Sequence, residues 1–268
     1  MPLSYIAVYL VCFLASLLGP LCGIGGGVII KPVVDALGVM SVASVSFLSS
    51  ISVLTMSLAT LAQNAAAHTS TVNVRSMLPL ALGSAVGGMC GKLLFNSLSA
   101  VFPDADLIGA VQAFVLIALT LLVLAYTVNR SRVKTFDIKS PGLRAAVGFV
   151  AGACWSFLGI GGGPFNLAIL TFFFSMESKP AAQASLFIIA FSQTASFIYT
   201  LATGSVPDVA AIAIAGACAA AIAGSVVGRR LVKKMDSAAV DRLYLCSLVL
   251  IIAICCYNAA RFTGILAL

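Results

Sequence analysis

The sequence predicts an all-α polytopic membrane protein made of two inverted repeats, each a re-entrant, broken-helix hairpin followed by three transmembrane helices. Composition, the sidedness of the basic residues and a repeated glycine motif support this prediction. Apolar residues make up 61% of the 268 residues and charged residues 9%, whereas soluble domains carry about 25% charged residues. Lipid is the natural solvent for such a chain, and helices satisfy their own backbone hydrogen bonds there.

Eight apolar runs supply the predicted membrane segments, because roughly 20 apolar residues cross a bilayer core. The first run lacks the basic stretch of a signal peptide and continues into a glycine cluster, so we expect it to be part of the fold. The alternation of apolar and polar residues that is typical of membrane β-barrels is not seen. The runs cover residues 2–21, 39–67, 76–98, 107–128, 144–176, 180–203, 206–228 and 243–260.

Basic residues are concentrated in loops 129–144 and 229–242, whereas the breaks at 102–106 and 204–208 are acidic. Cytoplasmic loops carry an excess of Lys and Arg, so we expect both basic loops in the cytoplasm and the protein in the inner (plasma) membrane. This topology accounts for the net charge of +7, and no nucleic-acid partner is predicted. The eight cysteines lie in apolar segments without histidine partners, so we interpret them as packing residues rather than metal ligands.

With both basic loops in the cytoplasm, segment 144–176 must begin and end on the cytoplasmic side, so it cannot be a single span. Each half, about 15 residues long, would reach about 22 Å as a helix, less than the roughly 30 Å of the hydrocarbon core. We therefore predict a re-entrant hairpin there and a matching hairpin at 2–37 that opens to the outside. The predicted organisation is a first repeat at 1–128, a basic cytoplasmic linker at 129–143 and an inverted second repeat at 144–268.

Both hairpins turn at the same motif, GIGGG, at residues 23–27 and 159–163. Glycine permits the left-handed backbone of a tight turn, and the first N–H groups of the following helix have no helical acceptor. Together with the helix dipole, such groups bind anions without a charged side chain. The alternative is that the glycines only allow helices to cross closely. The candidate substrate-binding glycines are Gly25, Gly26, Gly27, Gly161, Gly162 and Gly163.

Polar side chains on neighbouring segments are candidates to complete the site. Asn166 lies in the first turn after the second glycine cluster, and Gln193 lies on the next span. Ser46 aligns with Ser185 when the two halves are superimposed, and Ser49 lies one turn after Ser46. For each hydroxyl the alternative is a hydrogen bond to a carbonyl of its own helix.

Few charged residues fall within the apolar runs. Lys31 follows the first glycine cluster, and we expect its side chain to snorkel to the outer interface, with a substrate contact as the alternative. Asp35 and Glu177 are the acids closest to the spans, and both lie at segment ends. A chain of buried carboxylates for proton coupling is therefore not predicted.

Small residues recur at every fourth position in two further runs. Such stripes let helices pack closely in lipid, and their recurrence supports a duplicated architecture. They would also suit a homodimer, although the oligomeric state is left open. The stripes are Gly83, Gly87 and Gly91, followed by Lys92, and Gly216, Ala220, Gly224 and Gly228, followed by Arg229.

The paired GIGGG clusters, with Pro32 after the first and Pro164 directly after the second, resemble those of the TauE/SafE sulfite exporter family. The Gly/Ala stripes that end in GK at 91–92 and GR at 228–229 also match. The resemblance covers essentially the whole chain. It implies export or uptake of sulfite, of sulfonates such as sulfoacetate, or of related small anions across the inner membrane.

The function predicted from the sequence is a secondary transporter that moves a small sulfur-containing anion by alternating access. A passive anion channel or facilitator is the alternative, because the same N–H groups would serve it. An intramembrane enzyme is disfavoured, because no Ser–His, paired-Asp or HExxH arrangement is present. No catalytic residue, metal or cofactor is predicted, and the expected partners are a small anionic substrate and the lipid bilayer.

Overall fold

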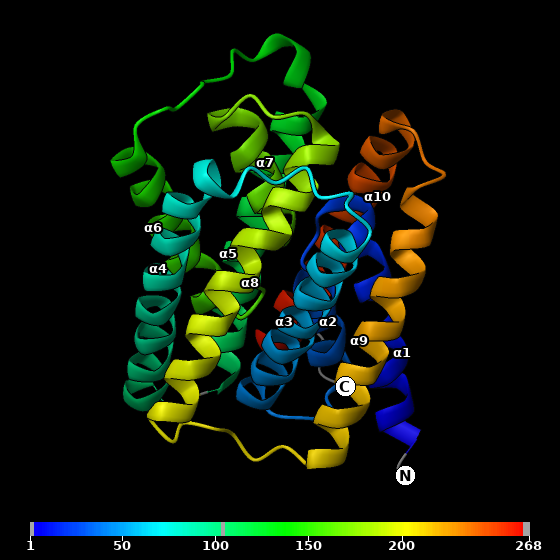
Figure 1. The fold of residues 1–268 in the computed structure, drawn as a ribbon. Coiled ribbons are helices and arrows are strands. Elements are labelled where there is room, and N and C mark those ends of the chain that lie inside the picture. Colours follow the sequence, from blue (N-terminus) through cyan, green and yellow to red (C-terminus); the bar gives the residue numbers. More distant parts are fainter. Residues whose placement is uncertain (1–2, 103–104, 265–268) are drawn as a thin grey trace.

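The computed structural model describes residues 3–102 and 105–264, and within these ranges it contains ten α-helices, one short 3-10 turn and no strand. Eight of the helices are long and apolar enough to cross a membrane, which confirms the prediction of a helical, multi-pass membrane protein. The helices are α1 (Leu3–Cys22), α2 (Gly27–Leu37), α3 (Val42–Ala66), α4 (Val74–Val101), α5 (Ala105–Val128), α6 (Pro141–Leu158), α7 (Gly163–Phe173), α8 (Ser178–Ala202), α9 (Ala211–Val232) and α10 (Ser237–Phe262), with the 3-10 turn at Arg130–Arg132 (Figure 1).

Both glycine clusters interrupt the chain as predicted, but the two arms on either side of each break are unequal. Helices α1 and α6 contain 20 and 18 residues, so they are about 30 Å and 27 Å long. Helices α2 and α7 contain 11 residues each, which is about 16 Å. The prediction of two equal half-depth arms was therefore wrong, because α1 and α6 run without a break to their glycine cluster while Gly38 and Phe174 end the return arms early.

One end of the bundle carries the basic connections. Arg130 donates to the carbonyl of Met176 at 3.1 Å, and Lys179 donates to the carbonyl of Met235 at 2.8 Å. We call this the basic end, because it holds every Lys and Arg of the chain except Lys31, Lys92 and Arg261. At the top of Figure 1 lie its connections, 67–73, 129–140, 174–177 and 233–236.

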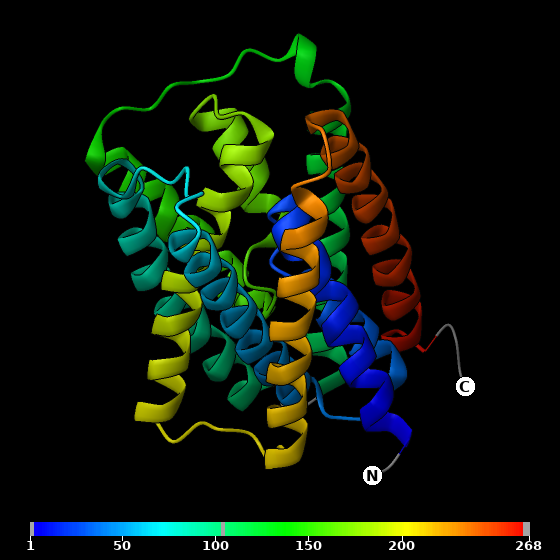
Figure 2. The same cartoon turned by 45° about the vertical axis from the view of Figure 1, so that its right-hand side comes forward.

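The opposite end, which we call the far end, carries connections 38–41 and 203–210, as both views show (Figures 1 and 2). Ser44 donates to the carbonyl of Asp208 at 3.3 Å, which ties these two connections together. Consequently α2 finishes at the far end, whereas α7 finishes at the basic end.

The small-residue stripes pack inside the chain. Helix α4 lies along α6, and helix α9 lies along α1. A Cβ atom on Gly87 would overlap the carbonyl of Phe149 in α6, and one on Gly228 would overlap the carbonyl of Leu17 in α1. The stripes thus serve close helix packing, the main role expected of them. The glycines of the stripes make these contacts within one chain, and the homodimer stays a prediction.

Candidate functional site

The two glycine turns meet at the centre of the bundle. The position that a Cβ on Gly25 would occupy lies 3.3 Å from both the carbonyl oxygen of Gly161 and the amide nitrogen of Gly163. A Cβ on Gly27 would overlap the carbonyl of Ile160. All residues of both GIGGG clusters are buried. Only residues without side chains allow two backbones to cross this closely, so we call this place the glycine crossing.

The helices that leave the glycine crossing begin with unusual backbone geometry. Gly26 and Gly162 are the N-cap residues of α2 and α7, with φ of 37° and 94°, and neither helix has a side-chain cap. Positive φ is strained for any residue with a Cβ. The first amides of each helix are therefore left to find acceptors elsewhere.

Several of these amides have no acceptor. In the second turn the N–H groups of Gly161, Gly162 and Gly163 make no hydrogen bond within the described residues, and in the first turn the same holds for Gly25 and Val28. Buried backbone N–H groups are nearly always paired. A group of unpaired donors at helix N-termini is a site suited to an anion.

Three predicted serines lie against the turns. Ser185 donates to the carbonyl of Gly23 at 2.9 Å, and Ser49 donates to the carbonyl of Gly27 at 3.4 Å. Ser46 contacts the backbone position of Gly159, and its hydroxyl is buried with no partner among the described residues. Ser185 therefore lies beside the first turn and Ser46 beside the second.

The two predicted amide side chains lie at the second turn. Gln193 packs against Gly161, and its Oε1 is buried with no hydrogen-bond partner in the described part of the chain. Asn166 accepts a hydrogen bond of 2.8 Å from Trp155 Nε1, and Trp155 stacks on Phe165 with ring centroids 4.7 Å apart. The structure thus gathers all eleven candidate residues around one crossing, while their contact with a substrate stays a prediction.

The family described as "Sulfite exporter TauE/SafE" matches residues 8–255, which includes both glycine turns. The chain belongs to the TauE/SafE sulfite exporter family. Comparisons with curated proteins and with solved structures found no match. The match confirms the resemblance seen in the sequence and makes this chain a membrane transporter of sulfur anions.

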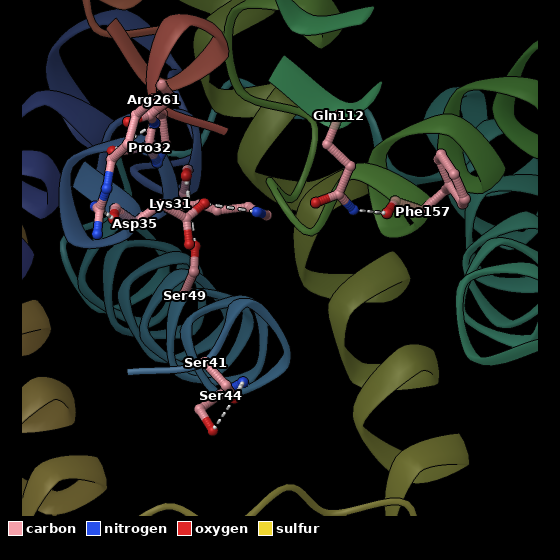
Figure 3. A network of polar contacts seen from close by, with 11 residues as sticks. Lys31, Pro32, Asp35, Ser41, Ser44, Ser49, Gln112, Phe157 and Arg261 are labelled. Carbon is pink, nitrogen blue, oxygen red and sulfur yellow. Dashed lines mark hydrogen bonds and ion pairs between the residues drawn. The ribbon is translucent and has the colours of Figure 1, made fainter. Parts of the chain in front are cut away.

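One charged pair lies inside this TauE/SafE protein, close to the glycine crossing (Figure 3). Lys31 is 3% exposed, and its Nζ lies 2.8 Å from Oδ2 of Asp35, which is 8% exposed. The expectation that Lys31 snorkels to the interface was therefore wrong. The acid lies one helical turn after Lys31 on the same face of α2, so the ammonium is satisfied within the bundle. The Lys31 side chain also passes within 3.4 Å of the Cβ position of Gly159.

Side chains of α10 hold the last turn of α2, as Figure 3 shows for Arg261. Arg261 Nη1 donates to the carbonyls of Asp35 and Ala36 at 2.7 Å and 2.9 Å. Asn258 Nδ2 donates to the carbonyl of Pro32 at 2.8 Å. The Arg261 bonds give donors to carbonyls near the C-terminus of α2, where a helix leaves carbonyls without intrahelical donors, and the Asn258 bond adds a donor at Pro32.

Sequence reasoning missed three polar residues that hold the broken helices. Asn258 is the first of them, and Gln112 donates to the carbonyl of Phe157 at 2.8 Å, just before the second glycine cluster (Figure 3). Tyr244 donates to the carbonyl of Pro164 at 2.7 Å, directly after that cluster. The available signal was a lone polar residue in an apolar span, since such residues face the protein interior.

Proposed function

We propose that this chain is a secondary transporter that moves a small sulfur-containing anion, sulfite or a sulfonate such as sulfoacetate, across the inner membrane by alternating access. The observation that carries the proposal is the set of unpaired backbone N–H groups at the glycine crossing. Unpaired N–H donors favour a ligand with hydrogen-bond acceptor atoms, and an oxyanion of sulfur has several acceptor oxygens.

Backbone amides also suit transport rather than permanent binding. They carry only partial charges, so the anion meets no full countercharge at Gly161 to Gly163 and can leave again. Ser46 adds a hydroxyl without a partner beside the same turn, and Gln193 adds a side-chain donor, its Nε2, at 3.4 Å from the Cβ position of Gly161. Substrate would be held by hydrogen bonds to these groups at the middle of the bundle.

The proposed mechanism depends on two inverted repeats, α1–α5 and α6–α10. Helices α2 and α7 leave the glycine crossing toward opposite ends, and the packing of α4 on α6 has its counterpart in the packing of α9 on α1. Broken helices that meet at the midplane are the usual plan of transporters in which one repeat moves against the other. The positive-inside rule places the basic end in the cytoplasm.

The experiment is counterflow of ³⁵S-sulfite in liposomes that contain the purified protein, at alkaline pH where sulfite is ionised. A transporter should take up labelled sulfite faster when the vesicles hold unlabelled sulfite, because the loaded carrier returns more readily than the empty one. A passive channel would show flux without this acceleration. Flux no greater than in protein-free liposomes for sulfite, sulfoacetate and thiosulfate would contradict the proposed function.

A further inference from the structure

Two polar cavities lie in the bundle, one toward each end. The basic-end cavity has a volume of about 170 Å³, and its lining includes Asn64, Lys179, Gln183 and Arg229. The far-end cavity has a volume of about 20 Å³, and its lining includes Ser50, Lys92, Ser156 and Ser196.

The two cavities are built from equivalent elements of the two halves. The basic-end cavity lies between the ends of α1, α3 and α9 and the start of α8. The far-end cavity lies between the ends of α6 and α8, the start of α3 and the C-terminal half of α4. Exchanging α1–α5 with α6–α10 converts one set into the other. Arg229 and Lys92, which follow the two small-residue stripes, thereby occupy equivalent places.

Each cavity is lined by residues that lead into one of the glycine clusters. The basic-end cavity is lined by Pro20 and Leu21, which precede the first cluster, and by Ala182, against which Gly23 packs. The far-end cavity is lined by Ser156, three residues before Gly159. A solute in either cavity would therefore lie beside the chain segment that leads into a glycine cluster.

The cations in these cavities lack a carboxylate partner. The ion pairs among the described residues are Lys31–Asp35 and Lys139–Asp137. Arg229 is instead held by neutral oxygens, those of Asn64 at 2.8 Å and Thr69 at 3.2 Å. Lys92 makes no hydrogen bond within 3–102 and 105–264, and its Nζ lies 5.3 Å from the ring centroid of Phe95.

We propose that the two cavities are the two entrances for the anion, with Arg229 recruiting it at the basic end and Lys92 at the far end. A positive charge that lines a cavity in low-dielectric surroundings and has no fixed counter-ion raises the local concentration of anions. The inference rests on the proposed function for its substrate, whereas the attraction of anions to each cavity depends only on the charges.

The difference in volume indicates which entrance this structure leaves open. A cavity needs about 10–15 Å³ to hold one water molecule, so the far-end cavity holds little more than one. The basic-end cavity, at about 170 Å³, has room for a small oxyanion. The structure thus corresponds to the state that faces the basic end, in which Arg229 lines the open cavity.

The first test measures ³⁵S-sulfite transport from each face, in right-side-out and inside-out membrane vesicles. We expect Arg229→Gln to raise KM roughly tenfold for flux that starts at the basic end and about twofold or less for flux from the far end. Lys92→Gln should do the reverse. Arg229→Lys and Lys92→Arg keep the charge and should restore KM. Arg230→Gln, an exposed neighbour outside the cavity, is the matched control. Equal changes from both faces would overturn the assignment.

The second test needs no transport. Gln183→Cys and Ser50→Cys place a thiol in the basic-end and far-end cavities, and each is labelled with an anionic and a cationic methanethiosulfonate reagent. Parallel labelling of the parent chain gives the contribution of its native cysteines. We expect the ratio of anionic to cationic rate at position 183 to fall about fivefold with Arg229→Gln and to stay unchanged with Lys92→Gln. At position 50 the effects should be reversed.

The two tests separate the failure of this inference from the failure of the proposed function. If the labelling ratios do not respond to the nearby cation, the cavities do not attract anions, and the inference is wrong even if sulfite is transported. If the ratios respond as expected but no sulfite flux is found, the two cavities do attract anions, and the proposed transport of sulfite is wrong.

Discussion

Helices α2 and α7 have the same length and leave the same glycine crossing, but they are anchored in different ways. Each has 11 residues and begins after a glycine N-cap with positive φ, Gly26 or Gly162. Helix α2 contains the buried pair of Lys31 and Asp35. Helix α7 contains no charged residue, and its Thr171 accepts a hydrogen bond of 3.3 Å from Tyr126.

The C-terminal ends of the two helices are also held in different ways. The last turn of α2 is held by the guanidinium of Arg261, a partly buried residue near the end of α10. The last turn of α7 is held by the basic linker, because the amides of Phe136 and Ile138 donate to the carbonyls of Phe172 and Phe173 at 2.7 Å and 3.0 Å. The shared element is therefore the glycine turn. The anchors differ, because α2 is held by charged side chains and α7 by backbone hydrogen bonds to the basic linker.

The largest expected effect on transport comes from replacing a glycine of either turn with a larger residue. Gly26→Leu and Gly162→Leu should both abolish sulfite transport while the protein still reaches the membrane, because a side chain at a positive φ strains the turn that presents the unpaired amides. At Gly162 a Cβ would also lie 2.5 Å from Asn166 Nδ2 and 2.8 Å from Trp155. The measurement is ³⁵S-sulfite uptake, normalised to the amount of protein in the membrane.

Gly204→Leu is the matched control for this prediction. Gly204 has φ of 63°, but no atom lies within 4 Å of its Cβ position, because it lies in a far-end connection. It therefore tests a leucine at a glycine of positive φ away from the glycine crossing, and uptake should be retained. Unchanged uptake in the Gly26 and Gly162 variants would contradict an anion site at the glycine crossing.

The next largest effect separates α2 from α7. Asp35→Asn removes one partner of a buried ion pair and leaves the Lys31 ammonium uncompensated, which costs about 3–5 kcal/mol of unfolding free energy. Thr171→Val in α7 removes one neutral hydrogen bond and should cost about 0.5–1.5 kcal/mol. Unfolding of the purified protein in detergent, followed by circular dichroism, measures both.

A double variant checks the cause of the Asp35 effect. Lys31→Met combined with Asp35→Leu removes both charges, and it should recover most of the stability lost in Asp35→Asn, since well-packed apolar residues replace a buried pair without large cost. If the double variant is less stable than Asp35→Asn, the α2 anchor does not depend on charge pairing.

The helical membrane architecture and the meeting of the two glycine turns could be predicted from the sequence. Apolar run length determines the spans, and the repeated GIGGG motif marks both breaks. The pairing of Lys31 could not be predicted with the same reasoning, because hydropathy treats a lysine near a segment end as an interfacial residue. Its burial depends on Asp35 one turn later and on Arg261, which lies more than 200 residues away and meets α2 only in the folded bundle.

A smaller effect is expected from the C-terminal anchor of α2. Arg261→Ala removes a charged donor from the carbonyls of Asp35 and Ala36, so it should lower the unfolding free energy by about 1.5–3 kcal/mol. Arg230→Ala, at an exposed position of the basic end, should change it by about 0.5 kcal/mol or less. The same detergent unfolding assay applies. Equal losses in the two variants would show that Arg261 does not hold α2.

The smallest expected effect is a spectroscopic one at the α7 turn. Trp155 is the only tryptophan of the chain, and its Nε1 donates to Asn166 beside Gly162. Sulfite that binds the free amides of this turn should change the Trp155 emission with a saturable dependence on concentration. Asn166→Ala, which removes a bond of about 0.5–1.5 kcal/mol, should alter the starting emission and move the saturable response to higher sulfite concentration, whereas Gly162→Leu should lose the response.

Free N-acetyltryptophanamide is the control for collisional quenching, which rises linearly and does not saturate. A response in the protein that matches this control would mean that the anion does not reach the α7 turn. A saturable response would place a bound anion close to Trp155, at the turn from which α7 begins, and would support an anion site at the glycine crossing.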